Sequence, residues 1–424
     1  MKVDIIIKNV DNLITLKGPN RPRTKEEMGD IGLINDGIVA IKGDKIIYVG
    51  KGELPSDIET HENTIFLDGK GKTVTPGLVD SHTHLVHGGS REHELSMKLK
   101  GAKYLDILEA GGGIHSTVKA TKEASFGQLY DKAKKSLDIM LGFGVTTVEA
   151  KSGYGLEDFD TEIKQMEVAN KLNEDHYVDI VSTFMGAHAI PPKYKDNPRA
   201  FIDIIIKEMI PQVADEKLAK FCDVFCEKGV FSVEESREIL EAAIKHGLLP
   251  KVHADEIEPM GGAELAAEVG CVSADHLVAA SEKGIRMMAE KGVIANLLPG
   301  TSFNLQSGKF AQARRMIEQG VPVALSTDYN PGSCPTENIQ LVMSFASIIM
   351  KMTPEEVITA ATINGAASVG LEEEIGSIEV GKKADIVIFD APNLDYIIYH
   401  FGINHTDKVI KRGKLAFEKS SNIL

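Results

Sequence analysis

The sequence predicts an α/β protein, a (β/α)8 TIM barrel with a small composite β-sandwich domain built from both termini. Three observations predict this fold. Between residues 74 and 370, apolar runs typical of strands alternate with segments of helical period. The two ends of the chain carry short alternating strands instead. The 424 residues, 43% of them apolar, are enough for a barrel of about 250 residues and a smaller module.

The N-terminal arm has the pattern of short antiparallel strands. Residues 3–16, 37–50 and 63–73 alternate apolar and polar side chains, with Gly and Asp between the runs. Residues 20–35 interrupt this pattern with Pro and mixed charge. We therefore expect a long loop at 20–35, which either covers the functional site or is an insertion away from it.

The same strand pattern returns only at the far end of the chain. It covers 376–390, 396–401 and 408–417. Neither arm has enough apolar residues to build a core alone, so we expect the two arms to share one. This predicts a composite β-sandwich domain from residues 1–73 and 371–424, and a barrel domain from residues 74–370.

Eight candidate strands alternate with helices in the middle of the chain. The strands are expected at 74–85, 145–151, 179–188, 222–227, 249–255, 272–276, 293–298 and 322–328. Segments of helical period lie between them, for example 126–144, 233–247 and 263–270. Eight such units predict a closed parallel barrel, in which the chemistry lies at the C-terminal ends of the strands.

The first candidate strand carries the motif on which the functional prediction depends. It ends in His82-Thr83-His84, and a Gly-rich turn with Arg91 follows. Side chains two apart on a strand project to the same face, so the two imidazoles would lie about 6.5–7 Å apart along it. That spacing suits chelation of one metal ion.

Polar residues also stand at the ends of the other candidate strands. They are Glu149 and Lys151 with Tyr154 in the next turn, His188, Glu227, His253 with Glu256, Asp275 with His276, Asn296, and Asp328 with Asn330. Five of the 13 histidines therefore fall where a barrel would bring them together. One histidine at a strand end is usually structural, but five at the same end predict a site.

Imidazole nitrogens and one carboxylate are good ligands for Zn²⁺ or Fe, and they leave one position open for water. We assign four residues to the metal: His82, His84, His253 and Asp328. Such an ion lowers the pKa of water to near neutrality and polarises a carbonyl. Asp328 or Glu256 would take and return the proton, and His276 would stabilise the oxyanion.

Other residues near these strand ends are candidates for substrate binding. Arg91 can hold a substrate carboxylate bidentately, or it is an exposed solubilising charge. Tyr154, between two glycines, is placed to donate its hydroxyl. Asn330, Gly332 and Ser333 offer side-chain and backbone donors next to the metal-site aspartate.

Two lysines and a glycine triplet are interpreted as structural features rather than as parts of the catalytic site. Lys151 and Lys228 raise the idea of a carboxylated lysine between two metals, but strand alternation points Glu227 and Lys228 to opposite faces. We read both lysines as structural or solvated. Residues 111–113 are all glycine but lack the spacing of a phosphate loop, which indicates a flexible loop bordering the site.

Composition narrows the class of protein. A net charge of −15 and a pI near 5.4 argue against nucleic acid or an anionic membrane as a partner. No apolar stretch reaches the length of a membrane span, and the first ten residues alternate like a strand rather than a signal peptide. We expect a cytoplasmic protein whose four cysteines are buried thiols, since no C-x-x-C pair is present.

Several long motifs resemble a known superfamily. PGLVDSHTHL, HADE, DHL, STD and the closing GSIEVGKKADIVIFD resemble the metal-dependent amidohydrolases, which implies a (β/α)8 barrel with a composite β-sandwich. HTHLVHGGSRE, KSGYGLE, GAHAIP, STDYNPGSCPTENIQL and residues 101–121 are similar to the imidazolonepropionase family within it. That resemblance implies hydrolysis of 4-imidazolone-5-propanoate to N-formimidoyl-L-glutamate in histidine degradation, with Zn or Fe.

The resemblance also implies roles for single residues. It assigns the metal to the same four ligands, and substrate binding to Arg91, Tyr154, His188, Glu256, Asn330, Gly332 and Ser333. Glu256 falls where family members have Glu or Gln, so its role as the base stays open beside that of Asp328. His276 matches the histidine at the end of strand 6.

Two competing hypotheses remain. An aminohydrolase that releases ammonia from a cyclic amidine uses the same ligand set, although Arg91 favours a small anionic substrate. A non-catalytic scaffold that has lost its metal is the other, and the intact ligands weigh against it. Barrels of this kind often pair, so a homodimer is one possible assembly, but the sequence does not determine the oligomeric state.

Overall fold

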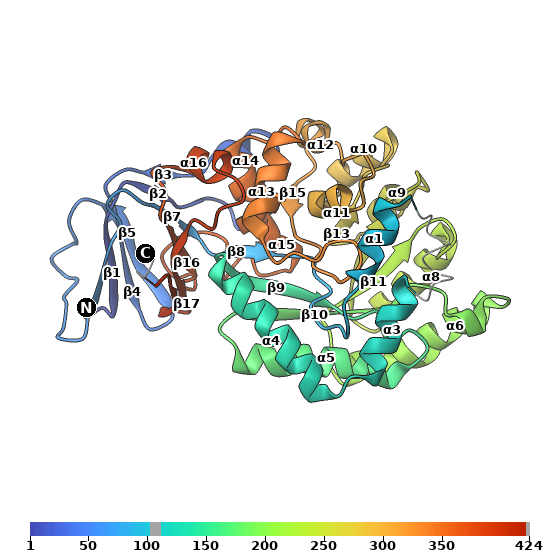
Figure 1. Ribbon diagram of the computed structural model, residues 1–424. Coiled ribbons are helices and arrows are strands. Elements are labelled where there is room, and N and C mark those ends of the chain that lie inside the picture. The colour runs from blue at the N-terminus through green and yellow to red at the C-terminus, as the bar shows by residue number, and fades with distance from the viewer. Residues whose placement is uncertain (102–111, 421–424) are drawn as a thin grey trace.

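The computed structural model of this chain describes residues 1–101 and 112–420, without the side chain of Lys98. Figure 1 shows a ring of strands surrounded by helices, with β-sheets from both ends of the chain to one side of it. Eight parallel strands form the ring in the order β15-β14-β13-β12-β11-β10-β9-β8. The predicted (β/α)8 barrel with extra β-sheets from the termini is confirmed.

Each barrel strand is short, and helices connect one strand to the next. The strands are β8 (Leu78–Asp80), β9 (Val145–Lys151), β10 (Asp179–Ala187), β11 (Phe221–Cys226), β12 (Leu249–Ala254), β13 (Ser273–His276), β14 (Ile294–Leu297) and β15 (Val323–Leu325). The helices of the first half are α1 (His93–Leu99), α3 (Ile114–Glu123), α4 (Phe126–Gly142), α5 (Phe159–Asp175), η2 (Pro192–Tyr194), α6 (Pro198–Ile204), η3 (Ile205–Met209) and α7 (Ile210–Asp215). Those of the second half are α8 (Val233–Lys245), α9 (Gly262–Val269), α10 (Glu282–Lys291), α11 (Pro299–Asn304), α12 (Ala313–Gln319), α13 (Ile339–Ile348), α14 (Pro354–Thr359), η4 (Ala360–Asn364) and α15 (Gly365–Ser368).

The first predicted strand, 74–85, is divided between the two parts of the molecule. Its beginning is β7 (Thr73–Pro76), which pairs with β16 outside the barrel, and only β8 belongs to the barrel. Gly77 separates them, and a side chain does not fit at this position, since a Cβ there would lie 2.2 Å from Thr146 Oγ1. His82 and His84 therefore follow the strand rather than lie on it.

The chain after β8 nevertheless continues the barrel wall. Asp328 N–H donates to the His82 carbonyl (3.0 Å), and His84 N–H donates to the Tyr329 carbonyl (2.9 Å). On the other side, Lys151 N–H donates to the Thr83 carbonyl (2.9 Å). These bonds close the ring between its first and last strands, and they join His82, His84 and Asp328 through their backbones.

Two sheets from the chain ends lie beside the barrel. One has the order β5-β4-β1-β6, and the other β18-β17-β16-β7-β2-β3, so the second joins strands of both arms. Their bounds are β1 (Ile5–Val10), β2 (Asn12–Ile14), β3 (Leu33–Ile34), β4 (Gly37–Lys42), β5 (Lys45–Lys51), β6 (Ile65–Asp68), β16 (Ile386–Phe389), β17 (Thr406–Lys411) and β18 (Lys414–Glu418). One buried cluster contains Ile7, Val39, Ile386 and Ile410, so the two arms share a core. We propose Gly77 as the boundary between this domain and the barrel.

The segment 396–401, expected as a strand, is helical instead. Helix α16 (Leu394–Tyr399) begins at Asn393, whose side chain accepts a hydrogen bond from Tyr396 N–H (2.8 Å). Leu394, Ile397 and Ile398 are buried, a three-to-four-residue spacing that places them on one helical face. A short apolar run fits either structure, and here the N-cap decides.

Residues 20–35 lie at the end of the barrel opposite to the strand C-termini. Helix η1 (Lys25–Gly29) buries Met28, whose carbonyl accepts from Thr359 Oγ1 (2.8 Å). The Asn364 side chain donates to the carbonyls of Arg23 (3.1 Å) and of Val323 (2.8 Å), the first residue of β15. The segment is therefore an insertion away from the site and does not cover it.

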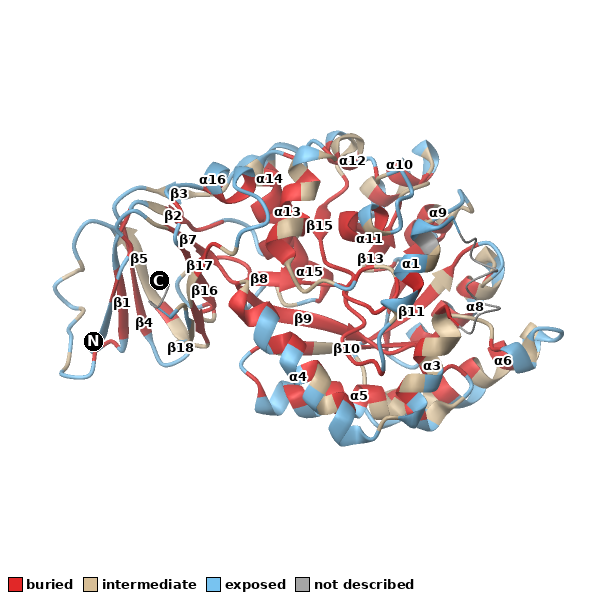
Figure 2. Ribbon diagram, viewed as in Figure 1, coloured by how far each residue is buried: buried red, intermediate tan, exposed pale blue. Residues whose placement is uncertain are grey.

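Burial follows the layers of the barrel. The strands are buried along their length, while the outer faces of the helices are exposed (Figure 2). All four cysteines are buried free thiols, as expected. Within the described residues, no helix combines the length and the apolar character that crossing a membrane requires.

Candidate active site

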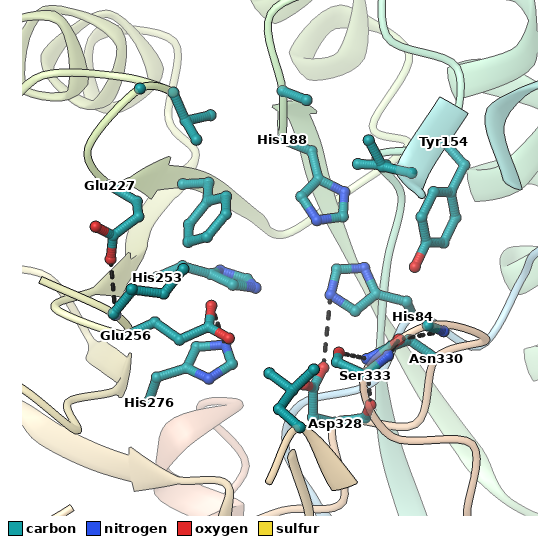
Figure 3. Close-up of a pocket in the computed structure, with 18 of the residues that line it drawn as sticks. His84, Tyr154, His188, Glu227, His253, Glu256, His276, Asp328, Asn330 and Ser333 are labelled. Atoms are coloured by element: carbon teal, nitrogen blue, oxygen red, sulfur yellow. Dashed lines mark hydrogen bonds and ion pairs between the residues drawn. The ribbon is translucent and has the colours of Figure 1, made fainter. Parts of the chain in front are cut away.

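A cavity of about 540 Å³ opens at the C-terminal end of the barrel (Figure 3). Its wall contains eleven of the residues predicted from the sequence, namely His84, Arg91, Tyr154, His188, His253, Glu256, His276, Asp328, Asn330, Gly332 and Ser333. His82 is the other predicted site residue, and it is completely buried next to this wall. Folding thus brings together residues that are up to about 250 positions apart in the chain.

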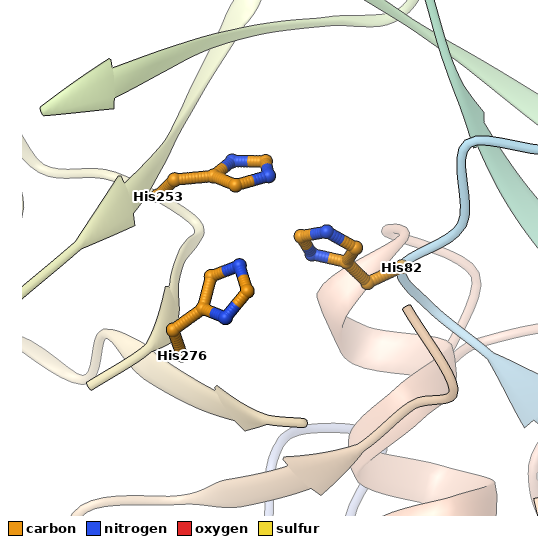
Figure 4. A group of neighbouring side chains, drawn as sticks. All are labelled: His82, His253 and His276. Atoms are coloured by element: carbon orange, nitrogen blue, oxygen red, sulfur yellow. The ribbon is translucent and has the colours of Figure 1, made fainter. Parts of the chain in front are cut away.

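Two overlapping groups of ligand atoms share His82. In one, His82 and His84 face Asp328, whose Oδ1 is 3.4 Å from His82 Nε2 and 3.8 Å from His84 Nε2. In the other, His82 lies beside His253 and His276, as Figure 4 shows. His253 is 4.6 Å from His82 and 5.7 Å from His84 between ring centroids. The four residues assigned to the metal surround one space, and His276 borders it as well.

The donor atoms around this space fit a bound cation. Among the described residues, His82 Nε2 and His253 Nε2 are buried and have no hydrogen-bond partner, and His84 Nε2 faces the same carboxylate oxygen as His82 Nε2. A buried polar atom without a partner costs free energy, so two such nitrogens, with a third imidazole and one carboxylate beside them, fit a bound cation. Imidazole and carboxylate are the ligands that Zn²⁺ and Fe accept.

Burial sets the protonation of the groups around the space. It lowers the pKa of His82, His84 and His276 well below the usual value, so these imidazoles are neutral. For His253, burial acts in the same direction, but the Asp223 carboxylate outweighs it and the pKa is raised. Burial also raises the pKa of Asp328 to about 6 and, together with the charge of Asp328, that of Glu256 to about 8.

Asp328 and His276 have strained backbones. Their φ angles are 56° and 73°, in the left-handed region that side chains other than glycine rarely adopt. Asp328 is held there by its N–H bond to the wall of the barrel and by Thr301, whose Oγ1 donates to Asp328 Oδ2 (2.5 Å). Thr301 leaves Oδ1 as the oxygen that faces the imidazoles. Such strain persists where the surrounding structure holds a residue for function.

Two carboxylates that sequence reasoning left without a role orient the imidazoles. Asp275 Oδ2 accepts from His82 Nδ1 (2.6 Å), and Asp223 Oδ1 accepts from His253 Nδ1 (3.0 Å). With Nδ1 as the donor, the lone pair of each ring is on Nε2. Asp223 lies within an otherwise apolar strand, FCDVFC, and a charge in a buried strand is the signal that would have identified it.

Arg91 lies in the cavity wall and is already held by one carboxylate. Its Nε and Nη2 donate to the two oxygens of Glu94 (2.8 and 2.9 Å). Glu94 Oε1 also accepts from Gly113 N–H (2.7 Å). An arginine has five N–H groups, so the edge formed by Nη1 and Nη2 remains for a second carboxylate. Of the glycine triplet, residue 111 lies outside the described residues.

Gly332 leaves the space in which the Arg91 guanidinium lies, and this gives a first prediction. A Cβ at position 332 would be 2.1 Å from Arg91 Nη1, so Gly332→Ala must displace that group. We expect KM to rise about tenfold with kcat changed less than threefold, because the role predicted for Arg91 is substrate binding. Steady-state kinetics measure this. Gly127→Ala, with no described atom within 4 Å of its Cβ, is the control, and an unchanged KM in Gly332→Ala would contradict the contact.

Tyr154 and His188 are held in the wall by helix α5. The Glu162 carboxylate accepts from Gly153 N–H (2.9 Å) and Gly155 N–H (2.7 Å) on either side of Tyr154. The Gly153 carbonyl accepts from His188 Nδ1 (3.0 Å), which leaves His188 Nε2 as an acceptor. Burial lowers the pKa of His188 to about 3, so this ring is neutral. Glu162 therefore positions both side chains.

The loop after Asp328 is organised by Asn330. Its Oδ1 accepts from the N–H groups of Gly332 and Ser333 (both 2.8 Å), and its Nδ2 donates to Ser333 Oγ (2.8 Å). These donors are used within the loop. The Ser333 hydroxyl accepts there, so its own proton is still available to a ligand.

Glu227 and Lys228 both lie in the cavity wall, which differs from the expectation that they point to opposite faces. The physical reason is that β11 ends at Cys226, so strand alternation no longer applies. Glu227 is buried and accepts from Ile257 N–H (2.9 Å), which secures the turn that carries Glu256. Glu256 Oε2 is 3.7 Å from His276 Nε2.

Comparisons with known proteins agree on the family. The amidohydrolase family model matches residues 73–416. An imidazolonepropionase of Alkaliphilus metalliredigens (strain QYMF) is 62% identical over 419 residues, 99% of each chain, and one of Geobacillus sp. (strain WCH70) is 56% identical over 415 residues, 97% of each.

Solved structures share the fold. A triazine hydrolase variant has a TM-score of 0.73 at 17% identity, covering 98% of this chain and 94% of that one. An adenosine deaminase from Xanthomonas campestris with bound zinc has a TM-score of 0.68 at 20% identity, covering 98% and 93%. At these identities the likeness concerns the fold alone.

Proposed function

The chain belongs to the imidazolonepropionases of the amidohydrolase family, and we propose that the cavity at the barrel end is where it carries out their reaction. It is a hydrolase that opens the ring of 4-imidazolone-5-propanoate to give N-formimidoyl-L-glutamate in histidine degradation. The observation that supports this site best is the gathering of three imidazoles and Asp328 around one space, with His82 Nε2 and His253 Nε2 unpartnered, in a cavity whose wall also contains Arg91.

We assign the metal to His82, His84, His253 and Asp328, with Zn or Fe as the ion, because imidazole and carboxylate suit both. When bound there, the ion supplies Lewis acidity, which activates water as the nucleophile and polarises the substrate carbonyl. His82 and His253 are prepared for this by Asp275 and Asp223, which fix their tautomers.

The substrate is a small anion, and we propose that Arg91 binds its propionate group through the Nη1–Nη2 edge. A charge-assisted pair of hydrogen bonds fixes both position and orientation. Tyr154, His188 and Ser333 line the same cavity. Tyr154 and Ser333 would contact the substrate ring through their hydroxyls, and His188 through a nitrogen of its imidazole. These contacts would hold the ring carbonyl near His276 and Asp328.

Hydrolysis adds water oxygen to the ring carbonyl carbon and breaks the bond from that carbon to the adjacent ring nitrogen. The carbon becomes the α-carboxylate of the product, and the nitrogen keeps a proton in the formimidoyl group. Asp328, with a pKa of about 6, would accept the proton of water at Oδ1. Glu256, with a pKa of about 8, is protonated near neutral pH and would give a proton to the leaving nitrogen. His276 would donate a hydrogen bond to the developing oxyanion.

Product analysis tests this function directly. Purified protein, loaded with Zn²⁺ or Fe²⁺, is incubated with 4-imidazolone-5-propanoate, and the products are identified by NMR while ammonia is assayed separately. We expect stoichiometric N-formimidoyl-L-glutamate and no ammonia. Release of ammonia would instead establish an aminohydrolase, and absence of turnover after metal loading would establish a non-catalytic scaffold.

A further inference from the structure

Five charged residues lie completely buried in the barrel interior, beneath the imidazoles. They are Glu149, Lys151, Asp223, Lys251 and Asp275, from strands β9, β11, β12 and β13, and none is exposed by more than 1%. Burying a charge is costly unless it is paired, and three acids with two lysines nearly balance. Neither lysine lines the cavity described above, so the cluster cannot act on substrate directly.

Lys151 lies at the centre of this cluster. Its Nζ is 2.6 Å from Asp223 Oδ2, 3.1 Å from Glu149 and 3.4 Å from Asp275 Oδ2. Asp223 and Asp275 are the carboxylates that hold His253 and His82. One ammonium group therefore connects the supports of two imidazoles that come from different strands.

Lys251 provides a contrast within the same cluster. It is equally buried, and its Nζ is 2.9 Å from Glu149 Oε2. No ion pair within 4 Å joins it to Asp223 or Asp275, both of which are described. Lys251 thus shares the burial and charge of Lys151 without an ion pair to either imidazole support.

We propose that Lys151 is a positioning residue that fixes the distance and orientation of His82 relative to His253, and so sets the affinity of the site for its metal. This role of Lys151 depends on the proposed metal site. A lysine between two carboxylates holds them at one separation, and each carboxylate holds one ring by its Nδ1–H. Mutation of residues that hold a metal ligand without touching the metal commonly changes metal affinity by about 10–100-fold.

Two matched variants test the proposal. Lys151→Met and Lys251→Met each remove one buried ammonium and keep the chain length, so each leaves three acids and one lysine. The dissociation constant for Zn²⁺ is measured by chelator competition at fixed pH, and the visible spectrum of the Co²⁺ form reports the ligand geometry. We expect Lys151→Met to weaken Zn²⁺ binding 10–100-fold and alter the Co²⁺ spectrum. Lys251→Met should bind within threefold of the wild type and keep its spectrum.

The outcomes separate this inference from the proposed function. A wild type that binds no metal would remove the metal site itself. Wild-type affinity in Lys151→Met, or an equal loss in both variants, would overturn the special role of Lys151 and leave the metal site standing. Should Lys151→Met not fold, Lys151→Gln takes its place, because it also removes the ammonium charge but keeps a polar side chain between the two carboxylates. A tenfold loss of Zn²⁺ affinity in Lys151→Gln supports the proposal, and an unchanged affinity overturns it.

Discussion

Replacing Asp328 with asparagine is expected to lower kcat by about 10²–10⁴-fold, the range that a proton-transferring side chain contributes. The amide has the shape of the carboxyl, and it can still accept the hydrogen bond from Thr301. It cannot take up a proton, and it is a weaker ligand than a carboxylate. Steady-state kinetics with elemental analysis of the same sample measure both consequences. Turnover within tenfold of the wild type would show that Asp328 has neither role.

Asp80→Asn is the matched control for that experiment. Asp80 is also buried, and it accepts from the N–H (2.9 Å) and Oγ1 (2.6 Å) of Thr327, directly before Asp328. It does not line the cavity. Burial raises its pKa to about 7, so loss of the charge costs less at this position than it would for a solvated carboxylate. We expect less than a tenfold loss of kcat in Asp80→Asn, and a loss equal to that of Asp328→Asn would trace both effects to the loop rather than to the carboxylate at 328.

The polar residues at the strand ends could be predicted because parallel strands in a barrel have to converge there. Eight apolar runs were enough to place His188, His253 and His276 near His82 without any knowledge of packing. Convergence at the C-terminal end of the barrel identifies these residues even where a strand ends earlier than predicted. His82 and His84 lie beyond β8, yet the backbone bonds of His84 and Asp328 continue the wall and keep them at the site.

What could not be predicted depends on where each strand stops and on which buried charges pair. Lys228 was placed on the outer face by alternation, but the strand ends at Cys226 and both Glu227 and Lys228 reach the cavity. Lys151 was interpreted as structural. Its pairing with Asp223 and Asp275 depends on how far apart three strands lie in the folded barrel, and the pattern within one strand does not contain that distance. The pairing of Glu94 with Arg91 could not be predicted either, because it joins a loop residue to a residue of helix α1.

Arg91→Ala is expected to lower kcat/KM for 4-imidazolone-5-propanoate by about 10–150-fold, since hydrogen bonds to a charged group contribute about 1.5–3 kcal/mol. The reason is loss of the Nη1–Nη2 edge, the part of the guanidinium that Glu94 leaves available. Most of the loss should appear in KM. The measurement is a comparison of steady-state kinetics for the wild type and the variant, with circular dichroism to confirm that both are folded.

A substrate analogue separates this carboxylate contact from any general damage to the cavity. With the propionate replaced by a neutral propyl group, the wild type should lose the same 10–150-fold, and Arg91→Ala should lose almost nothing further. Lys228→Met is the matched control, because Lys228 is the other Lys or Arg among the described residues of the cavity wall and is exposed. If Arg91→Ala still prefers the propionate by the full factor while Lys228→Met loses that preference, the carboxylate binds at Lys228, after the C-terminal end of β11, and the substrate lies in the reverse orientation.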